Sequence, residues 1–183
     1  MYSWKLKKSV RHLTQGQVIA HPTEAVYGLA CDPFNEAAVK KILTLKQRPA
    51  TKGFILIAAY FEQLEPLLEL PDNRILTPIL SRWPGPVTWI FPTRPSTPDW
   101  LSGKHKSLAV RVTHHPLSAT LSVAFDKPLV STSANPSHRP PAKTAIQVRH
   151  YFAEDRLLIL PGQTSGLKTT TPIYDAMTQQ RLR

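Results

Sequence analysis

Cysteine and long apolar runs are nearly absent from this sequence of 183 residues. Cys31 is the only cysteine, which excludes an intrachain disulfide and a cysteine-based metal site. The longest apolar run, FILIAAY at 54–60, is far below the roughly 20 residues of a membrane helix. The basic start, MYSWKLKKSV, precedes no apolar run and does not resemble a signal peptide. We therefore expect a soluble protein of the reducing cytoplasm without a membrane partner.

Acidic residues are also scarce, with 12 Asp and Glu against 23 Lys and Arg, and the formal net charge is +11. Such a balance favours binding of nucleotides, nucleic acid or other polyanions, although it also improves solubility without any ligand. Apolar and charged contents of 42% and 19% are ordinary for a globular protein. The length predicts a single domain spanning residues 1–183.

Hydrophobic periodicity predicts helices and strands that alternate along the chain. One expected helix contains Leu6, Val10 and Leu13 and stops at Gly16, and another follows an Asn35 cap and ends before Pro49. The other expected helices are an acidic surface helix at 61–70, a helix at 74–83 interrupted by Pro78, a helix with Pro116 in its first turn, and a helix at 144–152. The expected strands lie at 18–20, 54–59, 87–91, 107–112, 156–160 and 171–177, and the segment 128–135 is expected to run from a strand into a loop. This alternation predicts an α/β fold in which helices cover a sheet.

Polar side chains are concentrated where the expected strands begin or end, which is where such folds bind ligands. Small hydroxyls and an amide can orient phosphate or magnesium, and cations can neutralise phosphate or carboxylate. Each residue also has a simpler interpretation, since hydroxyls cap turns and cations favour the end of a helix. The hydroxyl and amide residues are Thr23, Ser131, Thr132, Ser133 and Asn135, and the cations are Lys46, Arg48, Lys52 and Arg111.

Several motifs that suggest other functions do not fit. The segment GQTSGLKT at 162–169 has the wrong glycine spacing for a phosphate-binding loop, and TTTP after it is a poor helix start. His114 and His115 are adjacent, so a strand would point them to opposite faces and away from a common metal. Ser133 lacks the Gly-x-Ser-x-Gly elbow of a hydrolase. Glu24 and Asp32 have no evident partner, and we expect surface or turn positions for them.

Five segments taken together resemble the YrdC family in its short single-domain form. They are HPTEAVYGLACDP, LKQRP…KG, SRWPGPVTWIFP, LAVRVTHHP and PLVSTSAN, and the resemblance runs from about residue 10 to the C-terminus. The family fold implied is an open, twisted, mixed β-sheet flanked by helices, with a basic concave face. The activity implied is the synthesis of threonylcarbamoyl-AMP and pyrophosphate from L-threonine, bicarbonate and ATP, with Mg²⁺ carried by the ATP and no protein metal site. A partner transferase complex would then modify adenosine 37 of tRNAs that read codons beginning with A.

The resemblance also implies roles for particular residues. The family's lysine-x-arginine and serine-x-asparagine pairs correspond to the expected catalytic residues Lys46, Arg48, Ser133 and Asn135. The expected ATP-binding residues are Lys46, Arg48, Lys52, Ser107, Ser133, Asn135, Pro141 and Arg183. The expected threonine-binding residues are Thr23, Arg111, Ser131 and Thr171, with the Arg111 guanidinium suited to a carboxylate.

The sequence departs from the family pattern at several points. Ile57 replaces a histidine that longer members place near threonine, and Pro141 replaces a serine on the nucleotide side, where only a main-chain contact could survive. The stretch NPSH at 135–138 replaces asparagine-x-serine-glycine, and TTTPIYD makes the assignment of Thr171 less secure. The alternative function is a non-catalytic module that binds duplex RNA or tRNA through its positive charge. The fixed set of hydroxyls and an amide beside the cations favours the enzyme.

Overall fold

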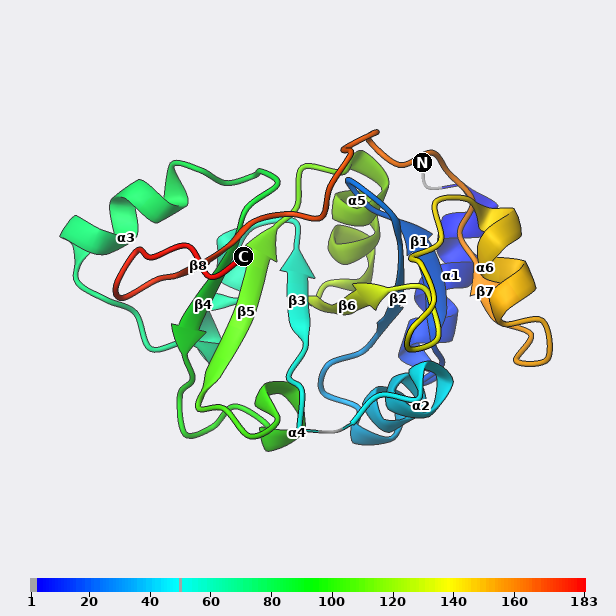
Figure 1. Ribbon diagram of the computed structural model, residues 1–183, viewed down its shortest axis with the longest axis horizontal. Coiled ribbons are helices and arrows are strands. Elements are labelled where there is room, and N and C mark those ends of the chain that lie inside the picture. The colour runs from blue at the N-terminus through cyan, green and yellow to red at the C-terminus, as the bar shows by residue number, and fades with distance from the viewer. Residues whose placement is uncertain (1–2, 50) are drawn as a thin grey trace.

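The computed structural model describes residues 3–49 and 51–183 as helices packed on an eight-stranded mixed sheet (Figure 1). The basic start and the cation-rich loop at 46–52 therefore include residues outside the described part, namely 1–2 and 50. The strand order is β7-β1-β2-β6-β3-β5-β4-β8. The strands are β1 (Ile19–Pro22), β2 (Tyr27–Cys31), β3 (Ile55–Ala58), β4 (Thr88–Pro92), β5 (Ser107–Val112), β6 (Leu129–Ser133), β7 (Leu158–Ile159) and β8 (Ile173–Asp175). The helices are α1 (Trp4–Thr14), α2 (Glu36–Lys46), α3 (Asn73–Leu80), α4 (Asp99–Ser102), α5 (Pro116–Phe125) and α6 (Ala145–Tyr151).

Most of the expected elements are confirmed, and local chemistry explains their bounds. The Asn35 side chain accepts a hydrogen bond from the Ala38 amide and so caps α2, as expected. Gly16 follows α1 with a φ of 69°, and Pro116 occupies the first turn of α5. The helix α3 continues through Pro78 and ends two residues later at Leu80.

Two expectations about secondary structure are wrong. The segment 61–70 is not an acidic surface helix but two 3₁₀ turns, Phe61–Gln63 and Glu65–Leu67, because Pro66 has no amide hydrogen for the bond to the carbonyl four residues back. The segment after β1 is not only a loop, because β2 returns antiparallel to β1 with His21 opposite Gly28. No apolar alternation marks β2, since both of its faces are buried.

The two faces of the sheet carry separate cores. One face packs under α1 and α5 around Ile19, Ile57, Leu121 and Leu129. The opposite face carries the larger core, which includes residues of α2 and α6 such as Ile42 and Val148. Within the described residues, no helix is long and apolar enough to cross a membrane.

Candidate functional site

A cavity of about 450 Å³ lies on the same sheet face as α1 and α5, over a part of the sheet that these helices do not cover. This volume lies in the usual range for ligand pockets. It is lined by residues 23–28, by Arg48, Lys52, Gly53, Phe54, Ile55, Ile90, Ser102, His105, Ser107, Ala109 and Arg111, and by Ser131, Thr132, Ser133, Thr170, Thr171, Ile173 and Arg183. Segments from six strands and from the C-terminal region thus meet at one site.

Strand alternation explains why polar groups line this cavity. On β5, Leu108 and Val110 enter the large core, so Ser107 and Arg111 face the cavity from the other side of the strand. On β6, the same period places Ser131 on the face that carries Leu129. These polar groups line the cavity, although Arg111 and Ser131 are only 5% and 6% exposed.

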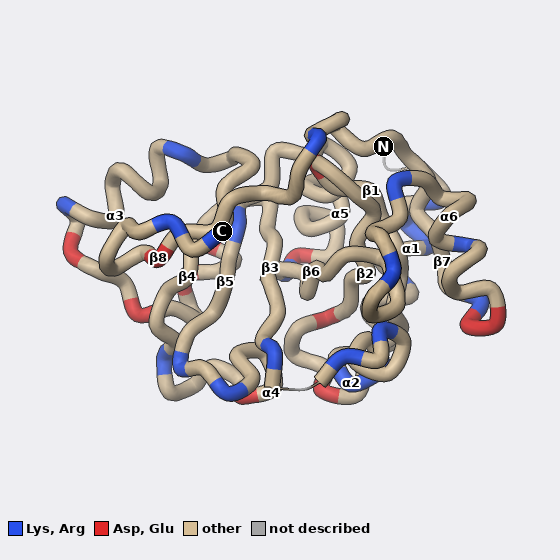
Figure 2. Tube along the Cα trace, in the orientation of Figure 1, with Lys and Arg blue, Asp and Glu red and all other residues tan. Residues whose placement is uncertain are grey.

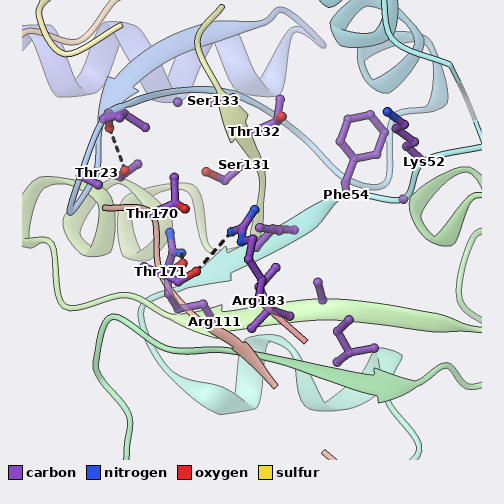
Figure 3. Close-up of a pocket in the computed structure, with 18 of the residues that line it drawn as sticks. Thr23, Lys52, Phe54, Arg111, Ser131, Thr132, Ser133, Thr170, Thr171 and Arg183 are labelled. Carbon is purple, nitrogen blue, oxygen red and sulfur yellow. Dashed lines mark hydrogen bonds between the residues drawn. The ribbon is translucent and has the colours of Figure 1, made fainter. Parts of the chain in front are cut away.

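The cavity is strongly cationic. Its described lining holds four Lys or Arg residues, Arg48, Lys52, Arg111 and Arg183, and a single acid, Glu24. Figure 3 shows Arg111, Arg183, Thr170 and Thr171 near one end, and Phe54 with Lys52 near the other. The lining therefore provides positive charge that can bind an anion. At the Arg111 end, the hydroxyls of Thr170 and Thr171 lie near the cations. Figure 2 shows Lys and Arg along most of the chain, so a basic concave face remains a prediction.

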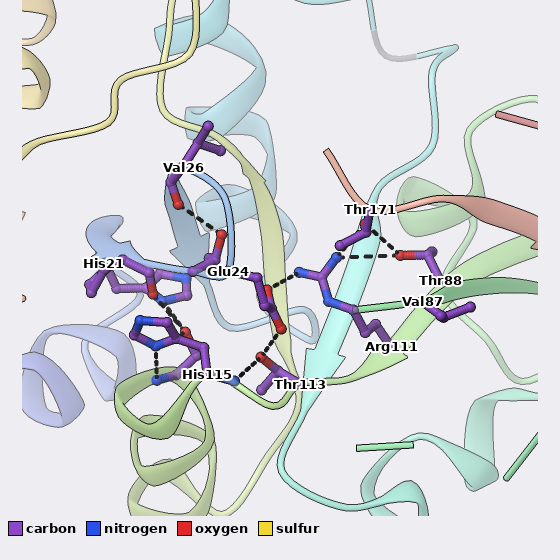
Figure 4. Close-up of polar contacts among 12 residues, drawn as sticks. His21, Glu24, Val26, Val87, Thr88, Arg111, Thr113, His115 and Thr171 are labelled. Carbon is purple, nitrogen blue, oxygen red and sulfur yellow. Dashed lines mark hydrogen bonds and ion pairs between the residues drawn. The ribbon is translucent and has the colours of Figure 1, made fainter. Parts of the chain in front are cut away.

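Arg111 and Glu24 form a buried ion pair at the polar end of the cavity (Figure 4). Arg111 Nη2 lies 3.2 Å from Glu24 Oε2, and Arg111 Nη1 donates to Thr171 Oγ1 at 2.8 Å. Thr113 Oγ1 donates to Glu24 Oε1 at 2.6 Å. Burial alone would raise the pKa of Glu24, but the Arg111 charge and the Thr113 hydrogen bond together hold this pKa below its ordinary value.

These contacts correct the expectation that the two carboxylates have no partner, although both lie at turns as expected. Glu24 is only 3% exposed and has a charged partner, and Asp32 pairs with Lys127 at 2.9 Å. Both partners lie far away in the sequence, so no local pattern could show them. The one signal that the sequence offered for Glu24 was its position next to Thr23 at the end of a strand.

Arg48 and Lys52 lie at the opposite end from Arg111. Arg48 Nη2 donates to the Gly53 carbonyl at 2.5 Å, and its guanidinium lies 5.4 Å from the centre of the Phe54 ring. A Cβ on Gly53 would meet the Ser102 carbonyl at 2.8 Å, so only glycine fits where this loop passes α4. From this loop Arg48 and Lys52 reach the lining of the same cavity as Ser107 and Ser133.

Lys46, Asn135 and Pro141 are not among the residues that line the cavity. The Lys46 ammonium is 4% exposed and donates to the Ser133 and Asn135 carbonyls and, at 3.3 Å, to Asn135 Oδ1. Burial, with a smaller effect of the Arg48 charge, lowers the pKa of Lys46 to about 8. Lys46 thus joins the end of α2 to the loop after β6, and its role toward ATP remains a prediction.

The other predicted residues lie in the cavity lining. Ser107, Ser131 and Ser133 are there, and so are Thr23, whose hydroxyl donates to the Val26 carbonyl at 2.8 Å, and Thr171. Arg183 also lines the cavity and donates from Nη2 to the Thr171 carbonyl at 3.2 Å. The structure thus brings together nine of the predicted positions from distant parts of the chain: Thr23, Arg48, Lys52, Ser107, Arg111, Ser131, Ser133, Thr171 and Arg183.

A buried histidine pair behind the cavity was not foreseen. His21 Nδ1 lies 3.1 Å from Ser118 Oγ, and His115 Nε2 lies 2.9 Å from the Gln163 carbonyl. Burial, followed by the His115 charge, lowers the pKa of His21 to about 4, so His21 is neutral at physiological pH. No cluster of three or more His, Cys, Asp or Glu in the described residues could hold a metal ion.

Comparisons with known proteins agree on one family. The Sua5/YciO/YrdC family model, described as "Telomere recombination", matches residues 11–183. A protein of Methylococcus capsulatus named threonylcarbamoyl-AMP synthase is 47% identical over 180 residues, which cover 98% of this chain and 97% of the relative. A protein of Coxiella burnetii with the same name is 46% identical over 182 residues, which cover 100% and 98%. The crystal structure of P. abyssi Sua5 complexed with L-threonine superposes with a TM-score of 0.89 at 31% identity, covering 96% of this chain and 52% of that one.

Proposed function

The chain belongs to the Sua5/YciO/YrdC family, and from this membership we propose that it is a threonylcarbamoyl-AMP synthase. The reaction joins L-threonine, bicarbonate or CO₂, and ATP into threonylcarbamoyl-AMP and diphosphate. The curated relatives that carry this name match nearly the full length of the chain, and their own lengths are covered almost completely.

The observation that supports this function best is the cationic cavity. Carboxylation of the threonine amine gives a carbamate, an anion whose oxygen must attack the α-phosphorus of another anion, ATP. Electrostatic repulsion between the two substrates is therefore a large part of the barrier, and fixed cations in a partly enclosed site lower it. Arg48, Lys52 and Arg183 line the cavity with free or partly free donors for this purpose.

We assign the Arg111 end of the cavity to threonine. Thr23, Ser131 and Thr171 surround this end with Arg111, and the Sua5 neighbour was solved with L-threonine bound. We assign the end with Arg48, Lys52, Ser107 and Ser133 to the nucleotide phosphates. Adjacent subsites would bring the carbamate close to the α-phosphate, which provides much of the rate acceleration of a two-substrate reaction.

Mg²⁺ would enter as part of the substrate MgATP. Glu24 is the only acid of the described lining and is already paired with Arg111, so the metal's oxygen ligands would come from the phosphates. When bound, the ion would offset phosphate charge during the attack. The chain's own residues then hold and orient the two substrates.

The product would serve a tRNA-modifying pathway in the cytoplasm, in which a transferase complex moves the threonylcarbamoyl group to adenosine 37. The RNA-binding alternative requires scattered cations on an open surface. The cavity instead places hydroxyls and cations together around a volume suited to a small ligand, which favours the enzyme.

Pyrophosphate release from ATP tests the proposed function on purified protein. We expect release only when L-threonine and bicarbonate are both present, with threonylcarbamoyl-AMP as the second product in mass spectrometry. Release that continues after either substrate is omitted would contradict the proposal.

A further inference from the structure

Two buried acceptor atoms at the polar end of the cavity, or directly behind it, accept no hydrogen bond from the described residues. One is Oε2 of the lining residue Glu24, which has only its ion pair with Arg111 at 3.2 Å, and the other is Nε2 of His21, which lies behind the lining. Buried polar atoms are nearly always hydrogen-bonded, so these two acceptors favour a donor from outside the protein at this end of the cavity. A buried donor nitrogen, Arg111 Nε, is also unsatisfied beside them.

The protonation of His21 follows from its neighbours. Ser118 has one hydroxyl proton, and its Oγ lies 2.7 Å from the Pro22 carbonyl, which can only accept. The His21 Nδ1, 3.1 Å from the same Oγ, must then carry the ring proton and donate it to Ser118. His21 Nε2 is therefore a bare lone pair, consistent with a neutral ring.

Gly28 separates this lone pair from the cavity. A Cβ at Gly28 would lie 3.5 Å from His21 Nε2 and 3.2 Å from Ser131 Oγ, and both Gly28 and Ser131 line the cavity. The missing side chain leaves His21 Nε2 and Ser131 Oγ on either side of the same narrow space. His21 thus contributes acceptor character to the polar end although it has no exposed surface.

Glu24 supplies the negative charge at this end. Its Oε1 accepts from Thr113, while Oε2 lies next to Arg111 Nη2 without a hydrogen bond of good geometry. A carboxylate beside a guanidinium is a suitable arrangement for a zwitterion, because the α-ammonium and α-carboxylate of an amino acid are separated by a single carbon. The groups that bind them must therefore be neighbours, as Glu24 and Arg111 are.

We propose that Glu24 binds the α-ammonium group of the amino-acid substrate, with His21 Nε2 as a second acceptor behind Gly28. This inference rests on the proposed function and extends it, because it assigns the substrate's positive group to a residue outside the predicted set. It also explains why one acid is kept in a cavity that otherwise collects cations.

The same carboxylate would favour movement of the intermediate toward ATP. The ammonium first loses a proton to solvent, and the free amine then adds to CO₂ with loss of a second proton, so that a carbamate anion replaces the positive charge. Glu24 repels that anion, and the cations at the other end, Arg48 and Lys52, attract it. Glu24 therefore binds the substrate more favourably than the intermediate, and the cations have the opposite preference.

The test compares Glu24→Gln with the wild type in calorimetric binding of two ligands. One is L-threonine, and the other is 2,3-dihydroxybutanoate, which keeps the carboxylate and the side-chain hydroxyl but has a hydroxyl in place of the ammonium. Glutamine retains the shape and the acceptor for Thr113, removes the charge, and replaces the acceptor Oε2 beside Arg111 by an NH₂ donor. We expect threonine affinity to fall about 10- to 100-fold, as for the loss of a charge-assisted hydrogen bond, and affinity for the hydroxy acid to stay within about twofold.

The hydroxy acid separates substrate contact from a structural effect on Arg111. If Glu24 only positioned Arg111, both ligands would lose affinity equally, because both present a carboxylate; that result, or unchanged threonine binding, would overturn the inference. The control is Asp32→Asn, which removes an acid paired with Lys127 outside the cavity lining and should leave both affinities unchanged. Wild-type protein that fails to bind threonine at all would instead reject the proposed function.

Circular dichroism establishes whether Glu24→Gln is folded. If it is not, Glu24→Asp takes its place. This variant keeps the negative charge, but its side chain is one methylene group shorter, so the charge lies farther from the ligand. The same criterion applies: a loss for threonine of about fivefold or more, with no loss for the hydroxy acid, supports the inference, and any parallel change contradicts it.

Discussion

At the scale of single residues, the cations of the site differ in how many of their N–H donors already form hydrogen bonds within the protein. The Lys46 ammonium is directed to three oxygen acceptors after β6, and Arg111 is held by Glu24 and Thr171. Arg48 uses one Nη for the loop carbonyls, and the Lys52 ammonium makes no hydrogen bond to the described residues. Arg48, Lys52 and Arg183, which makes one side-chain hydrogen bond to the Thr171 carbonyl, therefore have the most capacity left for a phosphate.

Arg48→Ala should remove most of the synthase activity and leave the fold intact. Loss of a charge-assisted contact to phosphate costs about 1.5–3 kcal/mol, or about 10- to 150-fold in ATP affinity, while a partly exposed cation contributes little to stability. The measurements are an ATP titration of pyrophosphate release and thermal unfolding. Lys7→Ala, an exposed cation on α1, is the control, and near-normal turnover of Arg48→Ala at low ATP would place Arg48 outside the site.

The buried Lys46 should make stability depend on alkaline pH. Its pKa is lowered to about 8 in the folded protein, against 10.5 for an ordinary lysine. Between these values the unfolded chain holds the proton that the folded chain has released, so the free energy of unfolding rises with pH through this window. Below about pH 8 both states are protonated and this gain is absent.

Denaturant unfolding of the wild type and Lys46→Met measures this effect, because the other titrating groups are common to both proteins. We expect the wild type to gain up to about 3 kcal/mol relative to the variant between about pH 8 and pH 10.5. Parallel pH curves for the two proteins would show that the folded state keeps the Lys46 proton.

At the scale of elements, the segment 161–172 closes one side of the cavity although it is neither helix nor strand. Hydrogen bonds to the loop after β1 hold it: the Ser165 amide donates to the Thr23 carbonyl at 3.3 Å, and the Leu167 amide donates to the Glu24 carbonyl at 3.2 Å. The Tyr27 hydroxyl donates to the Gly162 carbonyl at 2.5 Å and accepts from the Gly162 amide at 3.1 Å. These contacts carry Thr170 and Thr171 into the lining.

Tyr27→Phe should loosen this segment without disrupting the sheet. The change removes two hydrogen bonds between the Tyr27 hydroxyl and the backbone of Gly162, an exposed residue, at a cost of about 1–3 kcal/mol for the two together. Hydrogen exchange of the Ser165 and Leu167 amides should accelerate, and the KM for threonine should rise more than that for ATP, because Thr171 lies at the threonine end. Tyr60→Phe, at a partly exposed site, should change neither quantity; unchanged exchange in Tyr27→Phe would mean that the other contacts suffice.

At the scale of the whole molecule, sheet order determines which residues share the cavity. The strand β8 pairs in parallel with β4, and the chain then turns so that the Ile173 amide donates to the Arg183 carbonyl at 3.1 Å. Figure 1 shows this C-terminal segment lying beside β4 and β5. Arg183 thus reaches the cavity, whereas Arg181 is exposed and hydrogen-bonded to the Arg183 carbonyl at 2.9 Å.

Deletion of Leu182 and Arg183 should weaken ATP binding about tenfold, or about 1.4 kcal/mol, and Arg181→Ala should change it little. The deletion removes one of four cations of the lining, while Arg181 lies outside it. ATP titrations of the three proteins at one fixed salt concentration provide the comparison. Equal ATP affinity of the truncated and intact proteins would remove Arg183 from the site.

The sequence by itself determined the class of fold, most of the elements and the chemical character of the site. Some signals depend only on residues close together in the sequence, such as helix and strand periods, the Asn35 cap and Pro116. Such signals can be recognised without knowing the tertiary contacts. The five segments, LKQRP…KG and PLVSTSAN among them, indicated the family. Most of the cations and hydroxyls in these two segments line the cavity in the structure.

Only the tertiary structure decided which polar groups meet and which are already occupied. The pairing of Glu24 with Arg111 spans 87 positions of the chain, and the contacts of Lys46 with Ser133 and Asn135 span as much, so no short-range pattern contains them. The complete burial of Leu64 and Leu68, in a segment expected on the surface, likewise depends on the rest of the protein. The physical reason is common to these cases: the state of a charge or an apolar side chain depends on what surrounds it, and the sheet draws those surroundings from distant segments.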